Sequence, residues 1–306
     1  MMKRQELPRA PFFDAEALRI ELTAMFKASD GPDDCRPKVL KRLKELVTDA
    51  HQGARARLEA TAQGRDCAAA LSTFHDELIH LIFDYTAAHV YHPTTSGSRD
   101  EKISVAATGG YGRGLLAPYS DIDLLFILPY RQTPWSESVA EYMLYMLWDL
   151  GLKVGHATRT VSQCVALARS DMTIRTSLLD TRYLLGDREL FEDFETRFRE
   201  DVVKGTAREF IAAKMGEREN RHAQTGESRY RVEPNVKDGK GGLRDLHTLH
   251  WLSSYVYGCG LDGEDLPKGV FEDEEIKTFH RSEDFLWTVR CHMHFERGRA
   301  DERLSF

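Results

Sequence analysis

Apolar residues recur at helical spacing through most of the first 92 residues. A first helix is expected directly after Asp14, a second spans Val39 to Val47, and Gly31–Asp34 predicts a turn between them. A third helix, from about Cys67 to Tyr91, carries one apolar face made of Leu71, Phe74, Leu78, Leu81, Ile82 and Tyr85. The chain therefore begins with a helical segment, and the Thr-, Ser- and Gly-rich stretch 92–100 predicts a linker after it.

The pattern changes after this linker, where short apolar runs replace the helical period. Ile103–Thr108 and Asp121–Leu128 predict strands, and the second is apolar enough at its distal end to be buried on both faces. From Val139 to Leu150 the apolar residues return to helical spacing, and Gly151 ends that helix. Leu152–Val161 predicts a third strand. Strand, turn, strand, helix and strand together indicate an α/β core.

The remainder of the chain, from Ser162 onward, is mostly helical in pattern. Two glycine-rich stretches interrupt it, at 234–242 and 258–263, and the last helix is expected at Asp273–Arg297. The sequence of 306 residues is 42% hydrophobic, which is ample for a buried core. We therefore expect two helical regions with an α/β unit between them.

Composition excludes several classes of protein. Lys and Arg number 42 against 49 Asp and Glu, so the net charge is −7, and non-specific binding to nucleic acid is not expected. No apolar run approaches the 18 residues that a membrane-spanning helix needs, and no signal peptide is recognised at the N-terminus. The five cysteines form no Cys-x-x-Cys pair. These features predict a cytoplasmic protein without disulfides, membrane or nucleic acid.

The strongest chemical signal is a glycine-rich turn followed by two aspartates. Glycines at 109, 110, 112 and 114 lie between the first two predicted strands, and a short helix is expected at Arg113–Ala117. Glycines permit close approach of the backbone, and free N–H groups at a helix start bind phosphate. Asp121 and Asp123 are two apart on a strand, so their carboxylates point to the same side and repel each other unless a cation lies between them. Such oxygen ligands suit Mg²⁺ or Mn²⁺ bound with substrate phosphates.

Each half of this pattern is common by itself, because glycines often form plain turns and an Asp-x-Asp pair is often solvated. The combination, with a strand on each side, is far more specific. It is neither a Walker A loop, since no Gly-Lys-Ser/Thr follows, nor a dinucleotide-binding fingerprint, since Leu115 stands where the third glycine belongs.

The stretch GGYGRGLLAPYSDIDLLFIL (109–128) resembles the nucleotidyltransferase superfamily that includes polymerase β and aminoglycoside nucleotidyltransferases. It is more similar still to the bacterial PII uridylyltransferase/uridylyl-removing enzymes, and segments 141–161, 171–187 and 231–252 continue the resemblance. The resemblance implies a nucleotidyltransferase fold of the α/β (α+β) class, with a small mixed sheet flanked by helical regions.

The resemblance also implies an organisation of the chain. We expect an N-terminal helical region at 1–95, a catalytic nucleotidyltransferase domain at 96–187, and a helical domain at 188–306 that carries the PNVKDGKGGLRD motif. Members of the family continue into an HD hydrolase domain, which removes UMP, and two ACT domains. We expect neither in this chain, so it would hold only the transferase half and would not remove UMP.

The activity that the resemblance implies is transfer of UMP from UTP to a tyrosine of the PII signal protein, with release of pyrophosphate. Asp121 and Asp123 would hold one or two Mg²⁺ or Mn²⁺ ions, and Gly109 and Gly110 would contact the β- and γ-phosphates. Further contacts with the nucleotide are expected from Arg113, Ser120, Lys240 and Arg244.

The loop that contains these last two residues, Asn235–Asp245, also carries Lys237 and three glycines. Composition alone fits an anion site and a solvated turn about equally. The resemblance favours a contact with the nucleotide or with PII.

A third carboxylate is expected in the superfamily, as a metal ligand or general base, but the later strand offers His156 instead. Asp171 and Asp180 are the alternatives. We nominate Asp171, although Asp-Met-Thr before an apolar run favours a helix N-cap at that position.

Two other His-containing motifs are interpreted as structural. His75-Asp76 reads as a pair on a helix surface, and Cys291-His-Met-His294 spreads its side chains around a helix rather than toward one point. Two alternative functions stay open. One is adenylyl transfer to a protein, as in the glutamine synthetase adenylyltransferase, and the other is nucleotide binding without catalysis.

Overall fold

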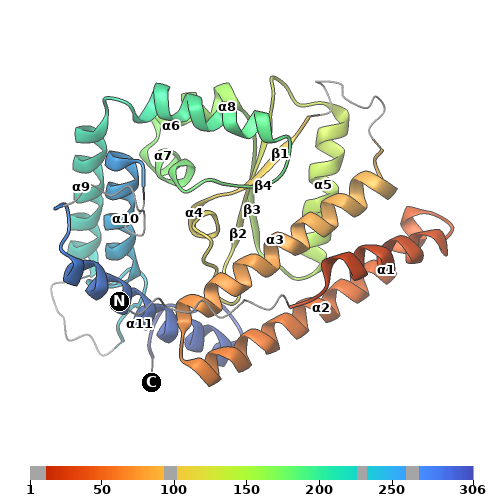
Figure 1. The fold of residues 1–306 in the computed structure, drawn as a ribbon, viewed down its shortest axis with the longest axis horizontal. Coiled ribbons are helices and arrows are strands. Elements are labelled where there is room, and N and C mark those ends of the chain that lie inside the picture. Colours follow the sequence, from red (N-terminus) through yellow and green to blue (C-terminus); the bar gives the residue numbers. More distant parts are fainter. Residues whose placement is uncertain (1–11, 93–101, 226–232, 260–268, 306) are drawn as a thin grey trace.

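The computed structural model describes residues 12–92, 102–225, 233–259 and 269–305. A four-stranded sheet lies at its centre with helices around it (Figure 1). Its strands, in the order β3-β2-β1-β4, are β3 (Val154–Thr160), β2 (Ile122–Leu128), β1 (Ser104–Ala107) and β4 (Arg182–Gly186). A small sheet flanked by helices confirms the fold class expected from the sequence.

The sheet is mixed. β1 pairs antiparallel with both β2 and β4, whereas β2 pairs parallel with β3 and sets Asp123 opposite Gly155. The three strands expected from the sequence are confirmed to within two residues. β4 was missed, because its five residues lie between helical segments and carry no alternating pattern that separates them from those segments.

Strand β2 is buried on both faces, as its apolar run predicts. Leu124, Phe126 and Leu128 belong to a core shared with the N-terminal helices and α5 (Pro134–Asp149). Leu125 and Ile127 point the opposite way, toward the helices that follow β3 and β4. Those helices are α6 (Val161–Ser170), α7 (Met172–Leu179) and α8 (Arg188–Phe198).

The N-terminal helices are α1 (Ala15–Lys27), α2 (Pro32–Thr61) and α3 (Gly64–His89). Asp14 caps α1 as expected, since its Oδ1 accepts hydrogen bonds from two backbone N–H groups of the first turn, both at 3.0 Å. The apolar face expected on the third helix is buried along its whole length. The turn at Gly31–Asp34 was placed wrongly, because α2 already starts at Pro32, whose fixed φ suits the first helical position.

The C-terminal part contains a short π-helical turn (Arg199–Val203), α9 (Ala207–Thr225), α10 (Leu243–Tyr257) and α11 (Asp273–Arg297). Helices α9 and α10 lie side by side at one end of the molecule, and α11 passes back beneath α3 (Figure 1). The bounds of α11 agree with those expected. After α11 the chain returns to the loop before α10, where Asn235 and Arg303 form an isolated bridge.

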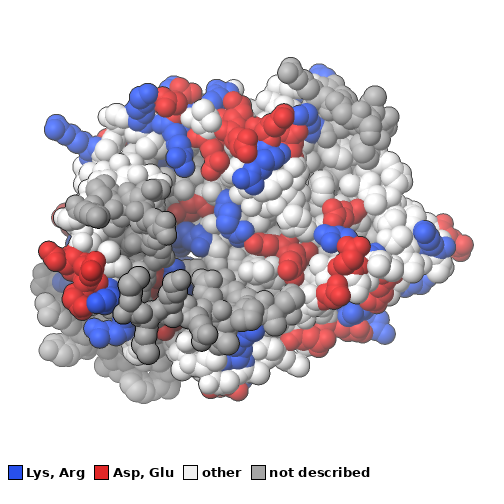
Figure 2. All heavy atoms as spheres, in the orientation of Figure 1, with Lys and Arg blue, Asp and Glu red and all other residues white. Residues whose placement is uncertain are grey.

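Acidic and basic side chains are interspersed over the face of the molecule seen in Figure 2, without a broad basic surface among the described residues drawn there. Within the described ranges, no helix combines the length and the apolar character needed to cross a membrane.

Candidate active site

The glycine-rich turn between β1 and β2 is itself the first turn of helix in this region, α4 (Gly109–Gly112). The helix expected at Arg113–Ala117 is therefore wrong by one turn, and Arg113 is the C-cap residue of α4. Gly109 has a φ of +57°, which favours glycine. A Cβ on Gly112 would lie 1.8 Å from the carbonyl oxygen of Asp180, so the turn approaches that residue too closely for any side chain.

Glycines also surround the carboxylate of Asp123. A Cβ added to Gly155 on the neighbouring strand would lie 2.5 Å from Oδ1 of Asp123, and one added to Gly109 would lie 3.4 Å from Oδ2. Asp121 directly precedes β2 and is exposed, while Ile122 between the two aspartates is buried in the core. The Asp123 carboxylate therefore lies beside the glycine turn, and a shared side for the Asp121 carboxylate stays a prediction.

The electrostatics of this pair favour a bound cation. Burial raises the pKa of the Asp123 carboxyl, the negative charge of Asp121 raises it further, and the Lys237 ammonium lowers it. Among the described residues, no side-chain or backbone donor forms a hydrogen bond with either carboxylate. Two adjacent carboxylates without donors fit a hard divalent ion.

A third protein ligand is not evident. Within the described ranges, no group of three or more His, Cys, Asp or Glu side chains converges on one point. The two aspartates would leave most coordination positions of Mg²⁺ to water and to substrate oxygens, which is how this ion is usually bound at phosphate-transfer sites.

A cavity of about 240 Å³ opens beside Asp123, between β2, β3 and α7. His156, the residue that the sequence offered in place of a third acid, lines it. Its ring lies 5.8 Å from that of Trp148 on α5.

The two other acid candidates already have structural partners. Oδ1 of Asp171 accepts hydrogen bonds from the backbone N–H groups of Thr173 (2.7 Å) and Ile174 (2.9 Å), so Asp171 is the N-cap of α7, the role its sequence context favours. Asp180 is buried, with a side chain 1% exposed, and forms an ion pair with Arg113. A metal-ligand role for Asp171 stays a prediction.

Arg113 and Ser120 lie at either end of the turn that leads to the aspartates. Besides Asp180, Arg113 contacts Nδ1 of His247 through Nη2 (3.4 Å), and its guanidinium lies 5.7 Å from the ring centroid of Trp251. Nη2 of Arg113 would also be 3.7 Å from a Cβ on Gly110. Ser120 accepts a hydrogen bond from Nη2 of Arg290 at 3.3 Å.

The loop before α10 is held in shape by its own hydrogen bonds. Oδ1 of Asn235 accepts from the backbone N–H groups of Lys237 (2.9 Å) and Asp238 (2.7 Å). Lys240 is exposed, and Nε of Arg244 donates to Asp238 at 3.2 Å. These bonds order the loop but leave both alternatives from the sequence open, so its contact with a nucleotide stays a prediction.

Sequence reasoning missed two charged residues beside this site. Arg290 on α11 donates to both oxygens of Glu302 (Nε–Oε2 2.9 Å, Nη2–Oε1 2.7 Å) and also reaches Ser120. Nζ of Lys237 lies 3.8 Å from the same glutamate. No motif near Arg290 or Glu302 indicates that they lie at this site, because each is more than 160 residues from the aspartates in the sequence.

The interpretation of His75-Asp76 as a surface pair is wrong. His75 is 3% exposed, and Asp76 accepts hydrogen bonds from the hydroxyl of Tyr111 (2.6 Å) and from two guanidinium nitrogens of Arg182 (2.7 and 3.0 Å). Because Tyr111 is part of the glycine turn, Asp76 fastens that turn to α3. The periodicity of α3 gave no sign that Asp76 faces inward.

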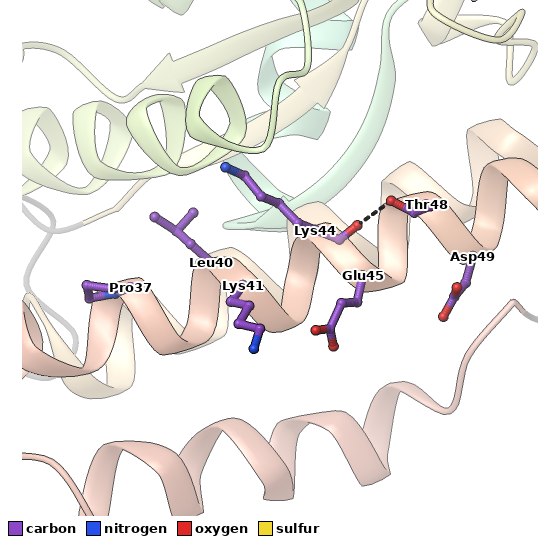
Figure 3. Close-up of a pocket in the computed structure, with 7 residues that line it drawn as sticks. All are labelled: Pro37, Leu40, Lys41, Lys44, Glu45, Thr48 and Asp49. Atoms are coloured by element: carbon purple, nitrogen blue, oxygen red, sulfur yellow. Dashed lines mark hydrogen bonds between the residues drawn. The ribbon is translucent and has the colours of Figure 1, made fainter.

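The interpretation of Cys291-His-Met-His294 is confirmed. The Cys291 thiol contacts the carbonyl oxygen of Gly64, while Nδ1 of His294 contacts that of Pro118, so the two side chains serve different parts of the fold. A groove also lies along α2, and none of the seven residues that line it is a candidate site residue (Figure 3). Residues of this one helix line it, with both signs of charge, and Thr48 bonds the carbonyl of Lys44 (2.9 Å).

Comparison with known proteins agrees with this geometry. A family model described as a nucleotidyltransferase domain matches residues 96–174, the segment that holds the glycine turn, both aspartates and β3. A second model, described as GlnD PII-uridylyltransferase, matches residues 209–306, which include the Lys237 loop, Arg290 and Glu302.

Individual relatives match almost the whole chain. It is 52% identical to a protein of Bradyrhizobium sp. (strain ORS 278) over 295 residues, which are 96% of this chain and 32% of the relative. Proteins of Nitrobacter hamburgensis and Rhodopseudomonas palustris are also 52% identical, with the same coverage of both chains. All three are named bifunctional uridylyltransferase/uridylyl-removing enzyme. The chain therefore belongs to the family of these enzymes, contains a nucleotidyltransferase domain, and spans about a third of the length of the relatives it matches.

Proposed function

We propose that this chain transfers UMP from UTP to a tyrosine of a PII signal protein and releases pyrophosphate. The observation that carries the proposal is the pair Asp121 and Asp123 beside the glycine turn, between β1 and β3 of the nucleotidyltransferase domain. The donor base and the acceptor are inferred from the relatives, whose names specify uridylyl transfer, and from the family model for PII uridylyltransferases.

The reaction is an in-line displacement at the α-phosphorus. The phenol oxygen of the acceptor tyrosine forms a bond to this phosphorus, and the bond from the phosphorus to the oxygen that bridges to the β-phosphate breaks. Pyrophosphate leaves with that bonding pair, and the phenol proton passes to the medium. Little covalent chemistry is required of the protein, so its contribution is positioning and charge.

The residues of this chain fit that task. Asp121 and Asp123 would bind one or two Mg²⁺ or Mn²⁺ ions, which when bound offset the charge of the phosphates and align the reacting oxygens. Gly109 and Gly110 allow the triphosphate to approach the backbone, because neither carries a side chain toward the site. Arg113, Ser120, Lys240 and Arg244 are the further phosphate contacts that we propose.

The test is a transfer assay read by intact mass. The chain is incubated with Mg²⁺ or Mn²⁺, a PII protein and each of the four nucleoside triphosphates in turn. We expect PII to gain one UMP with UTP alone, and loss of that gain when its modified tyrosine is replaced by phenylalanine. An AMP-sized gain with ATP instead would support the adenylyltransferase alternative.

The second candidate is nucleotide binding without transfer, and one observation favours it. In the described part of the chain no third His, Cys, Asp or Glu joins the two aspartates. Tight, metal-dependent binding of UTP with no mass gain on PII would support this candidate.

A further inference from the structure

Three separate segments meet beside Ser120, the residue that precedes Asp121. Arg290 comes from α11, Lys237 from the loop before α10, and Glu302 from the stretch after α11. Backbone hydrogen bonds fix this meeting, since the N–H of Val236 donates to the carbonyl of Glu302 (2.9 Å) and that of Leu304 to Pro234 (3.0 Å). The charged side chains are thus held at the catalytic turn by the fold itself.

The charges in this cluster do not cancel. Arg290 and Lys237 contribute two positive charges, and Glu302 contributes one negative charge. Glu302 is ionised: burial alone would raise the pKa of its carboxyl, but His294, whose Nε2 lies 3.6 Å away, and the Arg290 guanidinium, which donates to both oxygens, lower that pKa to about 2. The neighbouring Arg244 and Asp238 form a pair of their own at 3.2 Å. Within the described residues of this cluster, one positive charge therefore remains, and it lies beside Asp121 and Asp123.

The two cations have different amounts of freedom. Arg290 is bound through two nitrogens to Glu302, and its side chain is only 7% exposed. The Lys237 ammonium lies 3.8 Å from Glu302, beyond hydrogen-bond length, and its side chain is 32% exposed. Lys237 can therefore turn toward a ligand, while Arg290 keeps its place against Ser120 and supplies fixed charge.

We propose that Lys237, supported by Arg290 and the Ser120 hydroxyl, forms a subsite for the polyphosphate end of a nucleoside triphosphate. The identification of that ligand rests on the proposed function. A compact ammonium is suited to phosphate oxygens as a point charge, and Arg290, which pairs with the same Glu302, donates to Ser120 directly before Asp121. In this arrangement the C-terminal segment completes the nucleotide site, and Glu302 is a positioning residue that holds both cations.

The proposal is tested with Lys237→Met, which keeps the length of the side chain and removes its charge. Binding of UTP, inorganic tripolyphosphate and UMP to the full chain is measured by calorimetry in Mg²⁺, without PII so that no turnover occurs. The matched control is Lys102→Met, since Lys102 is also about one-third exposed (34%) and pairs with a carboxylate, that of Asp187 at 2.7 Å.

We expect Lys237→Met to weaken binding of tripolyphosphate and UTP at least tenfold and to leave UMP binding within twofold. Lys237→Arg should restore most of the affinity, and Lys102→Met should bind like the wild type. Equal binding of tripolyphosphate by the wild type and Lys237→Met would overturn the proposal. So would an equal loss for all three ligands, which would mean that Lys237 only shapes the loop, and so would a wild type that binds no tripolyphosphate.

The transfer assay separates this proposal from the proposed function. If the wild type binds tripolyphosphate through Lys237 but never modifies PII, the subsite stands and the acceptor is wrong. If the wild type modifies PII and Lys237→Met does so with an unchanged KM for UTP, the function stands and the subsite is wrong.

Discussion

The indole Nε1 of Trp251 donates a hydrogen bond of 2.8 Å to the buried carboxylate of Asp180. Because Arg113 forms its ion pair with the same carboxylate oxygen, Asp180 joins the glycine turn to helix α10. That helix begins directly after the loop that carries Lys237. One buried aspartate therefore connects the glycine turn to the helix that follows the Lys237 loop.

Trp251→Phe tests this connection. The variant keeps most of the apolar contact but removes the only N–H of the side chain, so the Asp180 carboxylate loses a buried donor. We expect the free energy of unfolding to fall by about 2 kcal/mol, measured by urea denaturation. Trp148→Phe, at a position 42% exposed, should change it by less than about 0.5 kcal/mol. Equal effects of the two substitutions would show that the hydrogen bond to Asp180 contributes nothing to stability.

Asp123→Asn should abolish UMP transfer without weakening the fold. The substitution removes a metal-binding carboxylate, and it also removes the charge that burial and Asp121 disfavour. We expect transfer to fall by at least a thousandfold while the melting temperature stays the same or rises. Retained transfer in this variant would contradict the assignment of Asp123 to the metal.

Gly155→Ala tests whether the space around Asp123 matters. The new Cβ would lie 2.5 Å from Oδ1 of Asp123, so the carboxylate must rotate away from its position. We expect metal-dependent binding of UTP, measured by calorimetry, to weaken at least tenfold. Gly216→Ala is the control: it lies within α9 with no atom near the added Cβ, and it should raise stability by about 0.5–1 kcal/mol. Unchanged binding in Gly155→Ala would mean that Asp123 does not need this orientation.

Two substitutions at Asp171 separate a helix cap from a metal ligand. Asparagine caps helices about as well as aspartate, so Asp171→Asn should keep both stability and transfer activity if the side chain only caps α7. Asp171→Ala should then lower the free energy of unfolding by about 1 kcal/mol. A stable Asp171→Asn protein with activity reduced a hundredfold would instead identify Asp171 as the missing third acid.

The local part of the site was predictable because its signals are local. Asp121 and Asp123 lie at the start of a strand that the apolar run from Leu124 to Leu128 shows to be buried. The N-cap role of Asp171 is likewise evident from the residues directly after it. In each case the pattern and the structure it produces lie within a few residues of each other.

The remainder depended on contacts that no local pattern reveals. Arg290 reaches Ser120 across 170 positions of sequence, and Asp76 meets Arg182 across 106. Both residues lie in long helices, where an isolated charge reads as part of a solvated face. Arg290 is buried and Asp76 is half-buried because tertiary packing overrides that reading, and each charge is then satisfied by partners from another segment.

His75 gives the fold a dependence on acid that can be measured. Burial lowers the pKa of His75 to about 4, against 6.5 for an unperturbed histidine, although the hydrogen bond from its Nδ1 to Leu71 (2.7 Å) acts in the opposite direction. The charges nearest to it are those of Asp76, which favours protonation, and His51, which disfavours it. The unfolded chain therefore binds a proton below pH 6.5 that the folded chain excludes, so stability falls as the pH decreases from 6.5 to about 4.

Replacing this histidine removes that proton uptake. Between pH 7 and pH 5 we expect the wild type to lose about 2 kcal/mol more of its unfolding free energy than His75→Gln does. Urea denaturation at half-unit steps of pH measures the difference. Near pH 8 the imidazole is neutral in both states, so the difference in unfolding free energy between the two proteins should no longer change with pH. Parallel curves over the whole range would show that His75 titrates alike in the folded and unfolded chain, and hence that its burial against α2 does not exclude the proton.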